Sequence, residues 1–337
     1  MTFLAVCMSC QVLFGALQAG PGGGGGGPRQ TLRLYAVGDI NLGRRDALDR
    51  LLQGDTLYPF AALVDTLRAA HILFGNLESA IALQTRHRDT SGMVFTAPLV
   101  AAQSLARAGF DILSTANNHG WDGGRSGMEE TMRQLTRAGV MFVGSAIGRP
   151  MAEQPVIVRS HGWRVAFFAV TRAWNAAPND FYGHEGANYV AWGDPRWIYP
   201  ALHRVKAEGR ADLLVVSVHA GTEFAEEPQP TLRRFYEGLV DAGADIVLGH
   251  HPHVLQPVVW YQGKPIAQSL GNFIFGQGRA WTELSAILRF DITARGLVRV
   301  SAIPVRAGYQ AQFADSAAAD SIRRRLNLPR SRKAGTT

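Results

Sequence analysis

Short apolar runs alternate along the chain with stretches in which apolar residues recur at helical spacing. Five runs have the length of buried strands: Leu32–Val37, Ile72–Gly75, Asp111–Ala116, Leu213–Val218 and Asp245–Gly249. The helical stretches are Pro59–Ala70, Leu99–Ala108, Gly127–Ala138, Tyr199–Glu208 and Thr231–Ala242. Four of these stretches are followed directly by a glycine, which easily adopts the left-handed conformation that ends many helices. The alternation predicts an α/β domain of largely parallel strands covered by helices.

Two other regions carry strand-like runs separated by turn signals. They are Val156–Val170 and Pro265–Val305, and they predict a second sheet with antiparallel character. Residues 172–197 contain three tryptophans in a setting rich in glycine, asparagine and proline, which indicates a long loop or lid.

The two ends of the chain differ from this body. Residues 1–19 are apolar and are interpreted as a signal peptide, cleaved or retained as a membrane anchor. Residues 20–30 hold six consecutive glycines and are interpreted as a flexible linker. We expect the folded domain over residues 31–310 and a terminal helix with a basic tail over residues 311–337. This organisation predicts an extracytoplasmic protein, secreted or anchored in the cell envelope.

The positions of the cysteines and of the basic residues argue against cysteine-based sites and against nucleic-acid binding. The only cysteines, Cys7 and Cys10, lie in the N-terminal apolar stretch, so the body has neither a disulfide framework nor a cysteine-based zinc site. The net charge of +7 is carried almost wholly by arginine, which suits binding of phosphate or carboxylate but is also what a GC-rich genome favours. No dense basic stripe is interleaved with aromatic residues, so nucleic acid is not an expected partner.

Polar residues that can bind metal follow five of the predicted strands. They are Asp39, Glu78, the pair Asn118 and His119, His219, and the run from His250 to His253. In open α/β sheets, ligand sites form outside the carboxyl ends of the strands. Any one of these residues taken alone also fits a helix cap, a turn or a core position. Their joint recurrence predicts a shared site.

The segment His251-Pro252-His253 is the sharpest local signal. In an extended segment, residues two apart point to the same side with Cα atoms about 7 Å apart. Two such imidazoles can each reach one metal of a pair separated by roughly 3.5–4 Å. Carboxylate, amide and imidazole donors favour two divalent ions of the Mn, Fe or Zn type. Such a pair can lower the pKa of bound water.

The motifs together resemble the CapA family, the capsule and poly-γ-glutamate synthesis proteins, within the calcineurin-like metallophosphoesterase superfamily. The resemblance covers roughly residues 31–305. The motifs that carry it are Val37-Gly38-Asp39, Gly75-Asn76-Leu77-Glu78, Asn117-Asn118-His119 with Asp122 and Gly124, Val218-His219-Ala220-Gly221-Thr222-Glu223, Gly249-His250-His251-Pro252-His253 and Ser269-Leu270-Gly271-Asn272-Phe273-Ile274-Phe275. It implies a four-layer α/β/β/α sandwich with metals at the strand ends.

The resemblance also implies roles for individual residues. The implied metal ligands are Asp39, Glu78 in the bridging position, Asn118, His219, His251 and His253. His119 resembles the acid that protonates the leaving oxygen. Asn41 stands where classical members carry a histidine. Asn41, Arg44, Glu223, His250 and Asn272 are weaker candidates for supporting a ligand or contacting substrate.

Three functions are consistent with these residues. The first is a metal-dependent hydrolase of the phosphoesterase type, acting on a phosphoester or an anionic polymer in capsule or poly-γ-glutamate biosynthesis. The alternative is a non-catalytic metal-binding partner of a membrane-bound polymer synthesis or export complex. A nucleotidase or nuclease of the same superfamily is less favoured, because no separate nucleotide-binding domain is visible.

Overall fold

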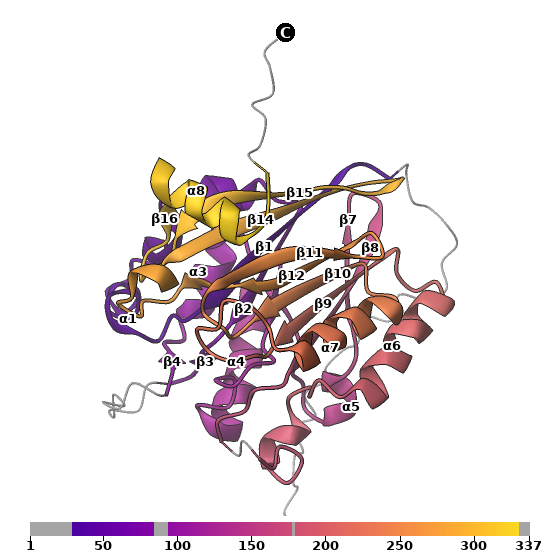
Figure 1. Cartoon of the computed structure of the whole chain (residues 1–337). Helices are drawn as coiled ribbons and strands as arrows, with labels where there is room; N and C mark the ends of the chain where they lie inside the picture. Colours follow the sequence, from indigo (N-terminus) through magenta and orange to yellow (C-terminus); the bar gives the residue numbers. More distant parts are fainter. Residues whose placement is uncertain (1–28, 84–93, 177–178, 330–337) are drawn as a thin grey trace, which may run out of the picture.

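The computed structural model describes residues 29–83, 94–176 and 179–329, and two β-sheets form its centre (Figure 1). The predicted signal peptide, most of the predicted linker and the basic tail lie outside the described residues. No helix in the described part of the chain combines the length and the apolar character needed to cross a membrane.

The first sheet has eight strands in the order β16-β15-β14-β1-β2-β5-β6, with β13 also paired to β1. Its parallel part comprises β1 (Leu32–Ile40), β2 (Ile72–Leu77), β5 (Ile112–Ser114), β6 (Met141–Val143) and β13 (Asn272–Ile274). Its antiparallel edge comprises β14 (Leu284–Thr293), β15 (Gly296–Arg306) and β16 (Gln312–Phe313). The end of β1 therefore lies in the middle of this sheet.

The second sheet has six strands in the order β11-β12-β10-β9-β8-β7. Its four central strands run parallel: β8 (Trp163–Thr171), β9 (Leu213–His219), β10 (Ile246–His250) and β12 (Lys264–Leu270). The edge strands β7 (Val156–Ser160) and β11 (Leu255–Tyr261) are antiparallel to their neighbours. A separate pair is formed by β3 (Ala80–Ile81) and β4 (Thr96–Ala97).

Helices cover the outer faces of the two sheets (Figure 1). The α-helices are α1 (Arg45–Leu52), α2 (Val64–Arg68), α3 (Ala101–Ala108), α4 (Gly124–Ala138), α5 (Arg149–Ala152), α6 (Pro195–Ala207), α7 (Pro230–Asp241) and α8 (Ser316–Arg325). Short 3₁₀-helices are η1 (Tyr58–Phe60), η2 (Glu185–Asn188) and η3 (Ala280–Thr282). The predicted helix Pro59–Ala70 is divided between η1 and α2.

Three hydrophobic clusters define the layers. One joins the facing sides of the two sheets and includes Phe74 and Phe167, whose rings stack with centroids 5.6 Å apart. A second lies between the first sheet and α1, α2 and α3. The third lies between the second sheet and α6 and α7. This arrangement confirms the four-layer α/β/β/α sandwich. Trp174, in the predicted loop or lid, is buried in the first cluster.

The division of strands between the sheets differs from the sequence-based expectation. The parallel strands do not share one sheet, because β9 pairs with β8 and β10 pairs with β9 in the second sheet. The long hairpin of β14 and β15 extends the first sheet instead of forming the second. Strands β8, β9 and β10 are buried on both faces, so their sequences do not reveal which sheet each one joins.

Candidate metal centre

Strand register brings the polar residues of the two sheets together. In the first sheet, Asp39 pairs with Asn76 of β2 and with Asn272 of β13. In the second sheet, His219 pairs with His250. Glu78 follows β2 by one residue, so it leaves the sheet at the same carboxyl edge as Asp39. The carboxyl ends of both sheets thus contribute to one buried group of side chains.

Two overlapping sets of side chains are arranged to hold cations. One contains Glu78, His219 and His251, and the other contains Asp39, Glu78 and His253. Within each set the potential ligand atoms lie within 4.8 Å of one another. Glu78 is common to both. Asn118 joins the first set, since its Oδ1 lies 2.7 Å from Nε2 of His219, which is 3.1 Å from Nδ1 of His251.

The chemistry of this group fits metal ions. Both carboxylate oxygens of Glu78 are buried without a hydrogen-bond partner, although buried polar groups are nearly always paired. Burial and the neighbouring Asp39 raise the pKa of Glu78 well above its usual range. Burial acts in the same direction on Asp39, but contacts with His250 and His253 hold its pKa well below the usual range. A cation between these two carboxyl groups would supply a positive charge beside them, which would favour the ionised form of Glu78.

The turn that carries His251 and His253 is not extended. Strand β10 ends at His250, and the backbone φ angles of His251 and His253 are 96° and 58°. Both values lie in the left-handed region, which costs energy in residues other than glycine and is concentrated at functional sites. The predicted side-by-side projection from an extended segment is therefore wrong. The turn instead directs one imidazole into each set of ligands.

His119 lies beside the same centre, and polar contacts on both sides hold its ring in place. Its Nδ1 is 2.7 Å from Oδ2 of Asp122, and its Nε2 is 3.4 Å from Nδ2 of Asn175. Asn175 also accepts a hydrogen bond from Nδ2 of Asn118 at 3.1 Å. If Asp122 accepts the Nδ1 proton, Nε2 is the ring atom free to exchange a proton with a substrate.

Four residues of this network were not among the predicted site residues: Asp122, which holds the ring of His119, and Asn76, Asn117 and Asn175. Asn76 donates to Asp39 at 2.9 Å and contacts Nδ1 of His219 at 3.2 Å. Asn117 donates to Oδ1 of Asn76 at 3.1 Å. Asn76 stands two residues before Glu78. Because side chains two residues apart in a strand point to the same face, this spacing could have identified Asn76 as a site residue. Asn175 lies in a loop, where no pattern in the sequence marks it.

Two of the weaker candidates support the centre directly. Oδ1 of Asn272 is 2.9 Å from Nδ1 of His253, which fixes the orientation of that ring. Asn272 is fixed in turn by Gln277, to whose Oε1 it donates at 3.0 Å. Nδ1 of His250 lies 3.2 Å from Oδ1 of Asp39, outside hydrogen-bond geometry, and both of its ring nitrogens are buried without such a partner.

The other weaker candidates lie at the margin. Asn41 is buried, but its Oδ1 accepts a hydrogen bond from the backbone N–H of Gly43 at 3.0 Å. Glu223 is exposed and close enough for its charge to contribute to the raised pKa of Glu78. Arg44 is half-buried with its guanidinium over the ring of Phe95. None of these three side chains forms a hydrogen bond or ion pair with a candidate ligand among the described residues.

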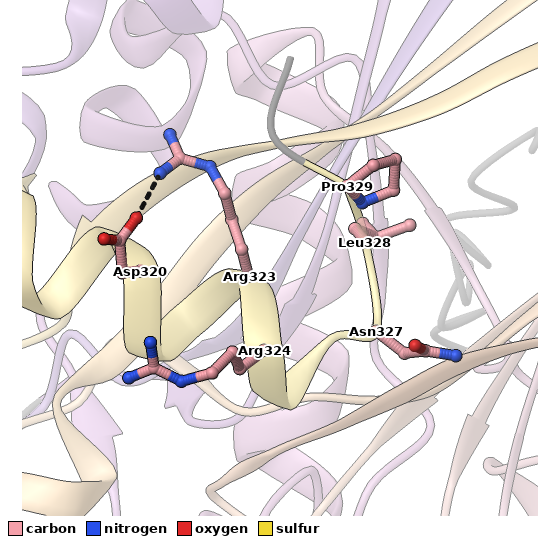
Figure 2. Close-up of a pocket in the computed structure, with 6 residues that line it drawn as sticks. All are labelled: Asp320, Arg323, Arg324, Asn327, Leu328 and Pro329. Atoms are coloured by element: carbon pink, nitrogen blue, oxygen red, sulfur yellow. Dashed lines mark hydrogen bonds and ion pairs between the residues drawn. The ribbon is translucent and has the colours of Figure 1, made fainter.

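A cavity elsewhere on the molecule contains none of the predicted site residues. Figure 2 shows its lining at the end of α8, where Arg323 pairs with Asp320 at 3.5 Å. The candidate metal centre and this cavity are therefore separate features.

Comparison with known proteins agrees with the motifs. The model of the family described as "Bacterial capsule synthesis protein PGA_cap" matches residues 33–277. The chain belongs to the PGA_cap family. The PGA biosynthesis protein CapA of Bacillus subtilis is 28% identical over 278 residues, covering 82% of this chain and 71% of that protein. The capsule biosynthesis protein CapA of Bacillus anthracis is 30% identical over 283 residues, covering 82% and 67%. The resemblance to CapA proteins is thus confirmed.

A more distant relative has a related name. A probable polyglutamine synthesis accessory protein of Mycobacterium tuberculosis is 26% identical over 255 residues, covering 73% of this chain and 67% of that protein. All three PGA_cap relatives match most of the length of this chain.

Without metal, this PGA_cap protein should lose stability as the pH falls below about 6.5. Burial, followed by the neighbouring His253, lowers the pKa of His251 from 6.5 to about 4. The unfolded chain takes up a proton at the ordinary pKa, whereas the folded chain does so only near the lowered value. The contribution of His251 to the free energy of unfolding should therefore fall by roughly 3 kcal/mol across this window.

The measurement is chemical unfolding of the chelator-treated protein at several pH values, compared with a His251→Asn variant. Glu78 has a raised pKa and acts with the opposite sign, so the difference between the two proteins isolates His251. Parallel stability curves for the two proteins would contradict the prediction.

Proposed function

We propose that this protein is a metal-dependent hydrolase of the phosphoesterase type with two divalent ions, acting in capsule or poly-γ-glutamate biosynthesis. The observation that carries the proposal is Glu78, which is shared by both sets of ligands and has two buried oxygens without partners. Membership of the PGA_cap family supports the biosynthetic setting. We further propose an extracytoplasmic location, on the basis of the apolar residues 1–19.

The two sets of potential ligand atoms divide the residues between the two ions. One ion would be held by Asp39, Glu78 and His253, and the other by Glu78, Asn118, His219 and His251. Oxygen and imidazole donors suit Mn, Fe or Zn. When bound, such a pair supplies an activated water and stabilises negative charge that develops on the substrate.

The protein's own residues would position and protonate the substrate. His119 is placed to hand a proton from Nε2 to the leaving oxygen, because Asp122 fixes the opposite side of its ring. Asn175 bridges His119 and Asn118 and so fixes the spacing between the proton donor and one ligand set. Asn76 and Asn272 orient Asp39 and His253.

One observation favours a second function, a non-catalytic metal-binding partner in envelope polymer synthesis or export. Asn41 occupies the position of a ligand histidine in classical superfamily members, and its oxygen is already bonded to the backbone of Gly43. The set around Asp39 then has three donors, so its ion would be held weakly. Under this alternative the metal stabilises the domain or contributes to a binding surface.

A comparison of hydrolysis and metal content separates the two functions. We expect the protein to hydrolyse a generic phosphodiester with added Mn²⁺, and an Asp39→Ala variant to be slower by about a hundredfold or more. An Asp65→Ala variant, changed at an exposed carboxylate of α2, should match the unaltered protein. Equal rates for the Asp39→Ala variant and the unaltered protein would contradict the hydrolase. Bound metal without hydrolysis of any phosphoester would favour the non-catalytic alternative.

A further inference from the structure

The side of the molecule opposite to the candidate metal centre is formed where the parallel strands begin. We define the amino edge as the starts of β1, β8, β9, β10 and β12, the ends of α6 and α7 that lead into β9 and β10, and the turns at residues 161–162 and 294–295. Pairing of Leu32 with Ile292 places the second turn beside the start of β1. Because Asp39 follows Leu32 by seven residues in β1, the amino edge lies about 20 Å from the metal centre.

The chain enters the domain at the amino edge. Arg29 pairs with Asp212 at 2.5 Å, and its guanidinium carbon is 4.8 Å from the ring centroid of Trp163. The backbone N–H of Gln30 donates to the carbonyl of His161 at 3.2 Å, and Nε1 of Trp163 donates to the carbonyl of Gln30 at 2.8 Å. If residues 1–19 are retained as a membrane anchor, residues 20–28 hold this edge within about 30 Å of the bilayer, the full reach of nine residues.

Two carboxylates on the amino edge are each shared by two basic side chains. The pairs are Asp212 with Arg29 and Arg164, at 2.5 and 2.9 Å, and Asp245 with Lys206 and Lys264, at 2.5 and 2.7 Å. The four basic side chains remain 34–43% exposed. Since one negative charge offsets only one of two positive charges, each group presents a surplus positive charge to solvent.

The two turns add arginines without a carboxylate partner. Arg159, close to the turn at residues 161–162, and Arg295, in the turn at residues 294–295, are exposed and form no ion pair within residues 29–83, 94–176 and 179–329. Other carboxylates of this edge are matched one to one, as Glu208 is with Arg210 at 3.7 Å. Asp241 accepts a hydrogen bond from Gln262 at 2.7 Å. Basic side chains therefore outnumber acidic ones on the amino edge.

The spread of these charges decides which partner they suit. They lie on strand starts, helix ends and turns of both sheets and do not converge on one pocket. Such a surface fits a partner that presents many anionic groups over an extended area, as a membrane containing anionic lipids does. The point of chain entry favours lipid over a soluble polyanion, because a tethered surface meets the headgroups at a high effective concentration.

We propose that the amino edge docks on an anionic lipid surface. Docking in this orientation turns the candidate metal centre away from the bilayer, so that the centre receives material from beyond the membrane surface. This inference goes beyond the proposed function, and it does not depend on hydrolysis.

The test is amide hydrogen exchange of the full chain on two kinds of vesicle, one of phosphatidylcholine and one of equal parts phosphatidylcholine and phosphatidylglycerol. Exchange at residues 159–164 and 293–296 should be slower on the anionic vesicles, whereas exchange at residues 222–228 of the opposite edge should be the same on both. Residues 1–19 carry no charged side chain, so their insertion contributes equally on both vesicles. The difference should vanish in about 1 M salt, where charges are screened within about 3 Å.

A double variant, Arg159→Gln with Arg295→Gln, measures the contribution of the unpaired arginines. It should lower the ratio of partition coefficients between anionic and neutral vesicles by about twentyfold, because each basic residue near an anionic surface contributes about fivefold. The matched control is Arg50→Gln with Arg234→Gln. These arginines are also exposed, and they lie in α1 and in the first half of α7, towards the opposite edge. Melting curves verify that both variants are folded.

Three results would overturn the proposal: equal exchange on the two kinds of vesicle, an equal loss of binding in the control variant, or slower exchange at residues 222–228 on the anionic vesicles. Polyphosphate at the same phosphate concentration tests the rival partner. If polyphosphate slows exchange at the two turns and anionic vesicles do not, the amino edge binds a soluble polyanion and the membrane proposal fails. Lipid-dependent protection of the turns in a protein without hydrolase activity would leave this inference standing while the proposed function fails.

Discussion

Replacing Glu78 with glutamine should leave the protein with at most one bound metal ion per chain and lower phosphodiester hydrolysis by about a thousandfold. Glu78 is the one side chain that belongs to both sets of ligands among the described residues. Its neutral amide would attract two cations less strongly, and their mutual repulsion would no longer be offset by a shared negative charge. Metal analysis of the purified variant and a rate assay with added Mn²⁺ measure the two effects.

The same variant should be more stable than the unaltered protein when both are metal-free. The buried oxygens of Glu78 have no partner, and the neighbouring Asp39 repels their charge. Glutamine keeps the shape of the side chain and removes the charge repulsion from Asp39. The matched control is Glu153→Gln, at the residue that follows α5, where burial also raises the pKa of the carboxyl group but no candidate ligand is near. Two metals bound to Glu78→Gln with full activity would contradict the proposed centre.

Much of the candidate site could be predicted because it depends on where strands end. Asp39, Glu78, His219 and the histidines after β10 follow apolar runs, and the carboxyl ends of parallel strands meet at one edge. Glycine after a helix was an equally local signal: Gly109 and Gly139 have φ angles of 100° and 76° at the ends of α3 and α4. Both signals arise from backbone rules that act over a few residues.

The remaining features depend on tertiary contacts that the sequence does not encode locally. The strands of both sheets are similarly apolar, so pairing of β9 with β8 was not visible. The left-handed residues His251 and His253 contradict their own backbone preference and are held by surrounding contacts. Asn175 reaches His119 from a loop that is distant from it in the sequence. Such convergence appears only in three dimensions.

Removing the imidazole of His119 should lower turnover by about a hundredfold to ten-thousandfold while metal content stays unchanged. His119 belongs to neither set of ligands, and its ring is held by Asp122 and Asn175 instead. A His119→Ala variant therefore loses the proton donor and keeps the donors for metal. Steady-state kinetics together with metal analysis distinguish this from a damaged centre.

The acidity of the leaving group gives a sharper test of proton donation by His119. A substrate whose leaving oxygen is strongly acidic needs little help from a proton donor, so the deficit of His119→Ala should shrink with nitrophenyl esters and grow with alkyl esters. An Asp122→Asn variant should show the same dependence in weaker form, because it disturbs the orientation of the ring and leaves the imidazole in place. The control is His203→Ala, at an exposed position of α6. A deficit that is equal for all leaving groups would exclude proton donation and assign His119 to binding alone.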